Sequence, residues 1–172
     1  RRPISGWIRK RNTYFNKVNP VFFQFLNNFN CIVKIWKSGC EVNGENIFLK
    51  GISIHEESPI REGRAYSEED AEQLLQWAKE LGCNYVRLAH YPHNEHMVRL
   101  ADKMGILVWE ENPVYWTISW ENEATFLNAQ NQLNEVINRD KNRASVIIWS
   151  MANETPTSDA RNLFLTKLAN HA

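Results

Sequence analysis

Residues 84–111 of the sequence, NYVRLAHYPHNEHMVRLADKMGILVWEE, contain two short apolar runs separated by an amphipathic segment. The runs, at 84–89 and 106–111, are typical of strands. Between them, apolar residues recur at the spacing of one helix face: Met97, Leu100, Ala101 and Met104. Gly105 closes this pattern, as glycine commonly does at a helix end. The segment therefore predicts a strand, a helix and a second strand.

The same alternation continues on both sides. Strands are expected at 47–54 and 145–152, and a helix over 68–81, where Ser67 and Asp70 form a capping-box pattern. A third helix is indicated by apolar residues along one face: Phe126, Ala129, Leu133, Val136 and Ile137. A last helix is expected to begin near Ser158 or Asp159 and to bury Leu163, Leu165 and Leu168.

Strands that are apolar on both faces and alternate with helices predict a parallel sheet covered by helices. A dinucleotide-binding sheet is disfavoured because no Gly-rich phosphate turn follows any of these strands. A barrel instead predicts polar residues just beyond successive strand ends. The fold expected is therefore an α/β (β/α)8 TIM barrel of which the first four βα units are present. Half a barrel would leave two strand edges unpaired.

Polar residues follow each predicted strand. They are His55 and Glu56, then His90, then Glu110 and Glu111, and finally Asn153 and Glu154. Taken alone, each has an ordinary structural explanation: Arg87 could pair with a buried carboxylate, and Trp109 and Trp149 could pack in the barrel. Their coincidence at one rim favours a shared pocket, because the carboxyl ends of parallel barrel strands form one face.

The composition suits a globular domain, with 172 residues of which 43% are hydrophobic. The net charge is zero, but residues 1–40 carry eight Lys/Arg and no acidic residue. This basic, aromatic segment could suggest a nucleic-acid or membrane-surface patch; a remnant of a preceding β-sandwich domain or an artificial extension is favoured, because no recognised motif accompanies the charge. We expect residues 41–172 to form the half-barrel, with Asn43-Gly44 as a hairpin turn.

The three cysteines have neither paired nor metal-ligand spacing, so free thiols are expected and a zinc site is not. No apolar stretch is long enough to cross a bilayer. The first residue is not Met, so a targeting signal cannot be assessed.

Four segments resemble successive strand-end motifs of glycoside hydrolase family 2, the β-galactosidase and β-glucuronidase family. They are FLKGISIHEESP, NYVRLAHYPHNE, GILVWEENP and RDKNRASVIIWSMANETP. The resemblance implies a (β/α)8 barrel in which Glu154 is the general acid/base and Asn153 binds the sugar 2-hydroxyl. It also implies that His55 and His90 line the sugar subsite, that Arg87 lies near the nucleophile, and that Glu111 lies close to the pocket.

The resemblance implies the chemistry of a retaining β-glycosidase, β-galactosidase-like first and β-glucuronidase-like second. In the family, the nucleophile is a Glu that closes the seventh strand in a Ser-Glu-Tyr/Phe-Gly context, which this sequence lacks. The isolated chain is therefore expected to be inactive. No cofactor is expected, and a catalytic magnesium is disfavoured because NPVYWTI stands where some members carry metal ligands.

A carbohydrate is the expected partner, nucleic acid is not, and a homo-oligomer is compatible with the sequence. The alternatives are a family 5-like glycanase, against which the His-Tyr-Pro-His segment argues, and a non-catalytic carbohydrate-binding barrel fragment.

Overall fold

The computed structural model describes residues 21–23, 33–36, 39–58 and 60–172. The strands are β1 (Val21–Phe23), β2 (Val33–Trp36), β3 (Gly39–Val42), β4 (Glu45–Ile47), β5 (Gly51–Ile54), β6 (Tyr85–Leu88), β7 (Leu107–Glu111) and β8 (Val146–Ser150). The helices are α2 (Glu68–Glu80), α3 (Glu95–Met104), α4 (Glu123–Asp140) and α5 (Asp159–His171). The rest of the predicted N-terminal segment, and Cys31, lie outside the described residues.

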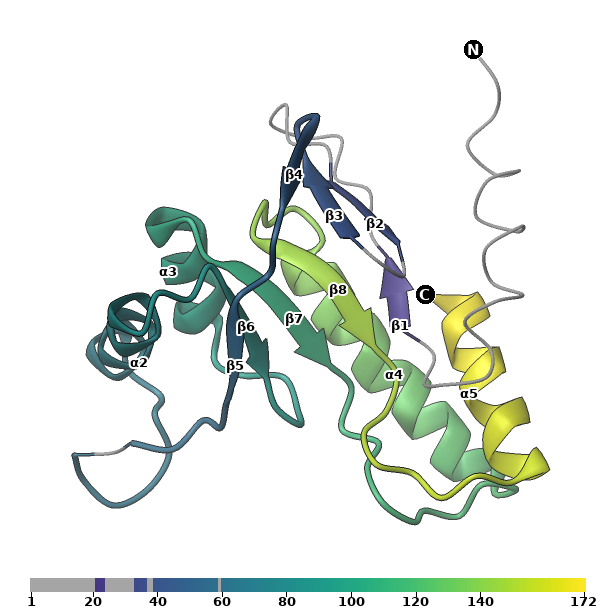
Figure 1. Ribbon diagram of the computed structural model, residues 1–172. Coiled ribbons are helices and arrows are strands. Elements are labelled where there is room, and N and C mark those ends of the chain that lie inside the picture. Colours follow the sequence, from purple (N-terminus) through teal and green to yellow (C-terminus); the bar gives the residue numbers. More distant parts are fainter. Residues whose placement is uncertain (1–20, 24–32, 37–38, 59) are drawn as a thin grey trace.

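Four parallel strands form the centre of the molecule. The larger sheet has the order β1-β8-β7-β6-β5, in which β5 to β8 pair in parallel, and each of these four strands is followed by a helix (Figure 1). This is the architecture of four consecutive units of a (β/α)8 barrel, so the predicted fold class is confirmed.

One predicted edge is occupied. The short strand β1 pairs antiparallel with β8, placing Phe22 opposite Trp149. The expectation of two unpaired edges is therefore wrong for β8. A three-residue strand has no periodicity that a sequence pattern could detect, and its pairing depends on a distant segment.

The helices begin and end close to the predicted positions because the local signals are strong. Ser67 and Asp70 form the capping box at the start of α2, and residues 60–66 precede it as a loop. Gly105 ends α3 in the left-handed conformation, with a φ of 68° that glycine adopts without a side-chain clash. Ser158 caps α5 through the backbone N–H of Arg161.

Two predictions about individual elements are wrong. The run 47–54 is split into β4 and β5, because the chain passes there from the smaller sheet to the larger one and Phe48 is 79% exposed. Leu163 is also 59% exposed, whereas Leu165 and Leu168 are buried as expected. The buried face of α5 runs through Arg161, Phe164, Leu165 and Leu168, and Leu163 lies off it.

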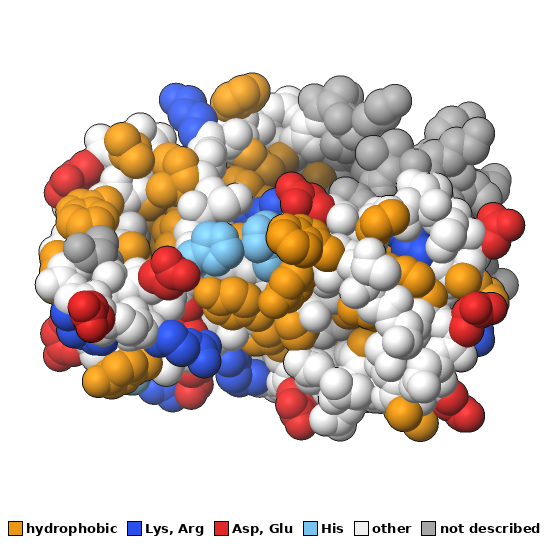
Figure 2. Space-filling view, turned by 90° about the horizontal axis from the view of Figure 1, so that it is seen from below, with side chains coloured by type: hydrophobic (Ala, Val, Ile, Leu, Met, Phe, Trp, Pro, Cys, Tyr) orange, Lys and Arg blue, Asp and Glu red, His pale blue; other side chains and the backbone are white. Residues whose placement is uncertain are grey.

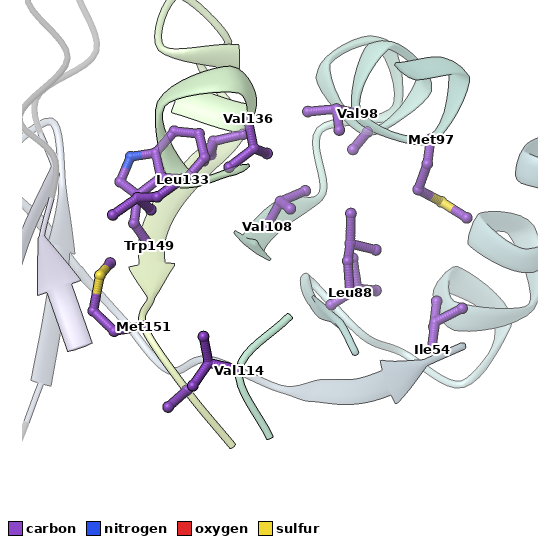
Figure 3. Packing of buried hydrophobic residues seen from close by; sticks show 14 of the residues in the cluster. Ile54, Leu88, Met97, Val98, Val108, Val114, Leu133, Val136, Trp149 and Met151 are labelled. Atoms are coloured by element: carbon purple, nitrogen blue, oxygen red, sulfur yellow. The ribbon is translucent and has the colours of Figure 1, made fainter. Parts of the chain in front are cut away.

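The main core lies between the sheet and the helices. Leu88 and Val108 on the sheet pack in the same cluster as Met97 of α3 and Leu133 of α4 (Figure 3). All five residues of β8 are buried, as expected for a central strand covered on both faces.

A second, smaller cluster covers the opposite face of the sheet at the amino end of the strands. Strands β2, β3 and β4 form a separate antiparallel sheet whose Cys40 packs with Ile147 and Ile148. The Asn43-Gly44 turn joins β3 to β4 with φ values of 53° and 90°, so the predicted hairpin turn is confirmed. Both described cysteines, Cys40 and Cys83, are free thiols.

Candidate active site

The predicted site residues come from the carboxyl ends of the four parallel strands. Viewed from that end, the molecule shows histidine side chains near the middle of the face, with hydrophobic, acidic and basic side chains around them (Figure 2). Strand register explains part of this grouping. Arg87 lies opposite both Ser53 and Trp109 in the parallel ladder, so these three side chains share one face of the sheet.

Arg87 is the hub of this face. Its Nη2 donates to Oε1 and Oε2 of Glu111, at 2.8 and 2.7 Å. Its Nε also donates to Oε2 of Glu111, at 3.1 Å. Glu111 is 1% exposed, so its charge is removed from water and depends on this pairing. The guanidinium carbon also lies 4.8 Å from the centroid of the Trp109 ring, in a cation–π arrangement.

The same guanidinium determines how Asn153 is oriented. Nη2 of Arg87 donates to Oδ1 of Asn153 at 2.6 Å. An arginine can only donate, so the amide oxygen of Asn153 must face Arg87. The amide nitrogen is then left to donate a hydrogen bond to a ligand. Asn153 is 7% exposed, and Arg87 therefore fixes the hydrogen-bonding character of this buried amide.

Glu111 determines how the ring of His90 is oriented. Nδ1 of His90 lies 2.8 Å from Oε1 of Glu111. A carboxylate only accepts, so Nδ1 carries the hydrogen and Nε2 of the neutral ring is left as an acceptor. Arg87 Nη2, 3.2 Å from Nδ1, is then a close neighbour of the ring rather than its donor. One carboxylate and one guanidinium thus orient the two groups predicted to bind sugar.

His55 lies at the edge of this network. Its ring meets the His90 ring edge to face, with 5.2 Å between centroids, and the side chain is exposed. The neighbouring Glu56 points inward and is 1% exposed. Its carboxylate accepts hydrogen bonds from the Arg64 side chain and from the backbone N–H of Asn94. This buried carboxylate ties the end of β5 to the start of α3 and so fixes the loop that carries His55.

Glu154 is exposed and stands outside the Arg87 network. Its Oε2 accepts a hydrogen bond from Nε1 of Trp116 at 3.4 Å, and its φ is 48°, in the left-handed region that non-glycine residues rarely adopt. The adjacent Asn153 is nevertheless tied to Arg87. Of the six predicted site residues, the structure joins Arg87, His90, Glu111 and Asn153 by polar contacts, His55 by ring contact, and Glu154 through the backbone of Asn153.

Glu110 faces the other side of the sheet, because side chains alternate along a strand. It is fully buried and pairs with Arg139 of α4 at 3.1 Å, and Arg139 also pairs with Asp140. Burial, followed by the nearby Asp140 carboxylate, raises the pKa of Glu110 well above its usual range. This charged cluster attaches α4 to the sheet and has no contact with the Arg87 network among the interactions described above.

Three aromatic residues of this region were not predicted as site residues. Trp109 packs against the smaller core cluster, as expected, and its ring also lies against the Arg87 guanidinium. Tyr115 and Trp116, on the loop after β7, are 47% and 67% exposed beside Asn153 and Glu154. The aromatic run VYW at 114–116, close behind the end of β7, is the signal that could have identified the last two.

Within the described ranges, no group of three or more His, Cys, Asp or Glu side chains is arranged to hold a metal ion. Over the same residues, no helix combines the length and the apolar character that crossing a membrane requires.

Comparison with known proteins identifies the family. The model for the TIM barrel domain of glycosyl hydrolases family 2 matches residues 33–171. A β-glucuronidase of Paenibacillus borealis is 35% identical over 139 residues, which are 73% of this chain and 23% of that protein. A β-galactosidase of Thermoanaerobacterium thermosulfurigenes is 33% identical over 158 residues, which are 89% of this chain and 21% of that protein.

The structural comparison agrees. A β-glucuronidase from Ruminococcus gnavus in complex with D-glucaro-d-lactam superposes with a TM-score of 0.76 and 29% identity, over 83% of this chain and 25% of that one. The chain thus spans about a quarter or less of these relatives. The match decides against the family 5-like alternative. The chain belongs to glycosyl hydrolase family 2, and its four βα units are part of the TIM barrel domain of that family.

Proposed function

We propose that this chain carries the acid/base side of a retaining β-glycosidase active site, with Glu154 as the proton donor and Asn153 as the sugar-binding amide. Cleavage of a glycosidic bond passes through an oxocarbenium-like transition state. Glu154 gives its proton to the departing oxygen while a carboxylate nucleophile bonds to the anomeric carbon. In the second step Glu154 takes a proton from water, which attacks the anomeric carbon and releases the nucleophile.

The observation that carries the proposal is the network around Arg87. It orients the nitrogen of Asn153 as a donor, which suits the oxygen of a sugar 2-hydroxyl, and that hydrogen bond strengthens in the transition state. It also leaves Nε2 of His90 as an acceptor for a sugar hydroxyl. Glu154 follows Asn153 directly in the chain, and its exposed carboxyl is open to a ligand.

We place the nucleophile outside this chain. A retaining enzyme needs its two carboxyl groups only about 5–5.5 Å apart. Glu111 already has both oxygens bound to Arg87, and Glu110 faces α4 on the other side of the sheet. The 172 residues alone are therefore expected to show no glycosidase turnover. Robust turnover by the purified chain would contradict this placement.

For the sugar, we propose a β-galactoside first. Two arginines of this region, Arg64 and Arg87, each pair with a carboxylate of the chain itself. Their charges are therefore compensated, which suits a neutral sugar better than a uronate. A β-glucuronide is the second candidate, because the Paenibacillus borealis and Ruminococcus gnavus relatives are named β-glucuronidases. Aryl β-galactosides and aryl β-glucuronides, compared by kcat/KM, separate the two.

The test of the acid/base role is Glu154→Gln in the hydrolytically active protein that contains this chain. Loss of a general acid should lower the rate on substrates with poor leaving groups by about 10²–10⁴-fold. Activated aryl glycosides, whose leaving groups need little protonation, should keep a larger part of their rate. Glu121→Gln, an exposed residue between β7 and α4, is the matched control and should remain active. Similar, near-wild-type rates of Glu154→Gln on both substrate types would remove Glu154 from this role.

A non-catalytic carbohydrate-binding protein is the alternative that the same network supports, because oriented donors and acceptors bind a sugar whether or not it is cleaved. Sugar binding without any hydrolysis by the complete protein would favour it.

A further inference from the structure

The loop after β7 brings an exposed indole to the carboxylate of Glu154. Nε1 of Trp116 donates to Oε2 of Glu154 at 3.4 Å, although the two residues are 38 positions apart in the chain. Trp116 is 67% exposed, so core packing does not explain its position. A large apolar side chain held in water beside a proposed catalytic group is more informative than an exposed polar one.

The backbone holds the two residues together. Asn153 donates its N–H to the carbonyl of Val114 at 2.9 Å, and Trp116 donates its N–H to the carbonyl of Asn153 at 3.2 Å. Tyr115 and Asn153 form a parallel bridge at the same place. These bonds extend the pairing of β7 and β8 beyond the strand ends, and they bring Trp116 next to Glu154.

Both partners have unusual backbone conformations. Trp116 has a φ of 57° and Glu154 a φ of 48°. The left-handed region brings the side chain of a non-glycine residue close to its own backbone, and such residues persist where the surrounding structure requires the conformation. Here the bridge between Tyr115 and Asn153 supplies that requirement. The two turns direct the indole and the carboxyl toward each other.

We propose that Trp116 is a positioning residue for Glu154, holding the carboxyl group through its indole N–H at the end of β8. The inference rests on the proposed acid/base role of Glu154. The indole N–H holds one carboxylate oxygen of Glu154 in place and leaves the other oxygen open to the ligand.

The test is Trp116→Phe in the hydrolytically active protein, because phenylalanine keeps an aromatic ring and removes the N–H. Loss of a contact made only to the proton-transferring carboxyl group should lower kcat and leave KM nearly unchanged. On a substrate with a poor leaving group, kcat should fall by about tenfold, because the acid is less well placed.

Trp77→Phe is the matched control, since Trp77 is a partly exposed indole on α2. It should leave both kcat and KM unchanged. Thermal unfolding of each variant separates a folding defect from a positioning effect, and the exposure of Trp116 predicts little change. The inference is overturned if Trp116→Phe has the same kcat as Trp77→Phe on a substrate with a poor leaving group while Glu154→Gln is strongly impaired. If Glu154→Gln itself retains full activity, the acid/base proposal fails instead.

Discussion

Replacing Arg87 by methionine should lower the free energy of unfolding by about 2–4 kcal/mol. The substitution keeps most of the apolar stem but leaves the Glu111 carboxylate without its cation. Removing one partner of a buried ion pair costs about 3–5 kcal/mol, because a charge stays buried and uncompensated. Glu111 is fully buried, but the Arg87 side chain is 21% exposed, so water reaches part of the pair and the lower range applies.

The assay is urea unfolding at pH 7 of four proteins: the wild type, Arg87→Met, Glu111→Gln and the double variant. Glu111→Gln should cost less than Arg87→Met, because the exposed part of the guanidinium can still be hydrated. The double variant carries neither charge and should be more stable than the sum of the single effects predicts. A coupling free energy of about 1–3 kcal/mol is expected for groups in direct contact.

Two results would refute this reasoning. If Arg87→Met costs less than about 1 kcal/mol, the pair is hydrated and Glu111 does not depend on it. If the two single effects add within about 0.5 kcal/mol, the residues are not coupled, and Arg87 does not hold the Glu111 carboxylate that orients His90.

Three further predictions concern the scaffold. Gly51→Ala should destabilise the chain by about 1–3 kcal/mol in urea unfolding, because the new Cβ would overlap the Tyr85 ring and lie 2.7 Å from the Tyr85 carbonyl oxygen. Leu75→Ala, at a fully buried position, should cost about 2–5 kcal/mol, whereas Leu81→Ala, at a position that is 71% exposed, should stay within about 0.5 kcal/mol. Burial lowers the pKa of His93 to about 4 from 6.5, so the unfolded chain binds a proton first on acidification. Stability should therefore fall by about 3 kcal/mol between pH 6.5 and pH 4, and by much less in His93→Gln; equal pH dependence would refute this.

The sequence predicts the helices best where local chemistry defines them. The Ser67–Asp70 capping box begins α2 at the expected residue, and Gly105 ends α3. The parallel order also follows from local patterns, because a strand, a helix and a second strand have few ways to pack. The grouping of Arg87, Glu111 and Asn153 needs one more step, since it depends on neighbouring strands ending at the same edge.

Structural features that depend on contacts with distant segments cannot be predicted from local sequence patterns. β1 is defined by its pairing with β8, and the split of 47–54 depends on where the smaller sheet ends. The exposure of Leu163 depends on which face of α5 meets the sheet and α4, and three nearby leucines leave that face ambiguous. The proposed role of Trp116 depends on a bridge between segments that are far apart in the chain.

Three glutamates at the ends of neighbouring strands show how surroundings assign different chemistry to one side chain. Glu111 has both oxygens engaged by Arg87 and one of them also by His90, so it orients its neighbours and has no oxygen left for a substrate. Glu110 is buried against Arg139, and its raised pKa reflects isolation from water on the far face of the sheet. Glu154 is exposed and has one weak donor, so of the three it is the carboxyl whose surroundings suit the acid/base role proposed above.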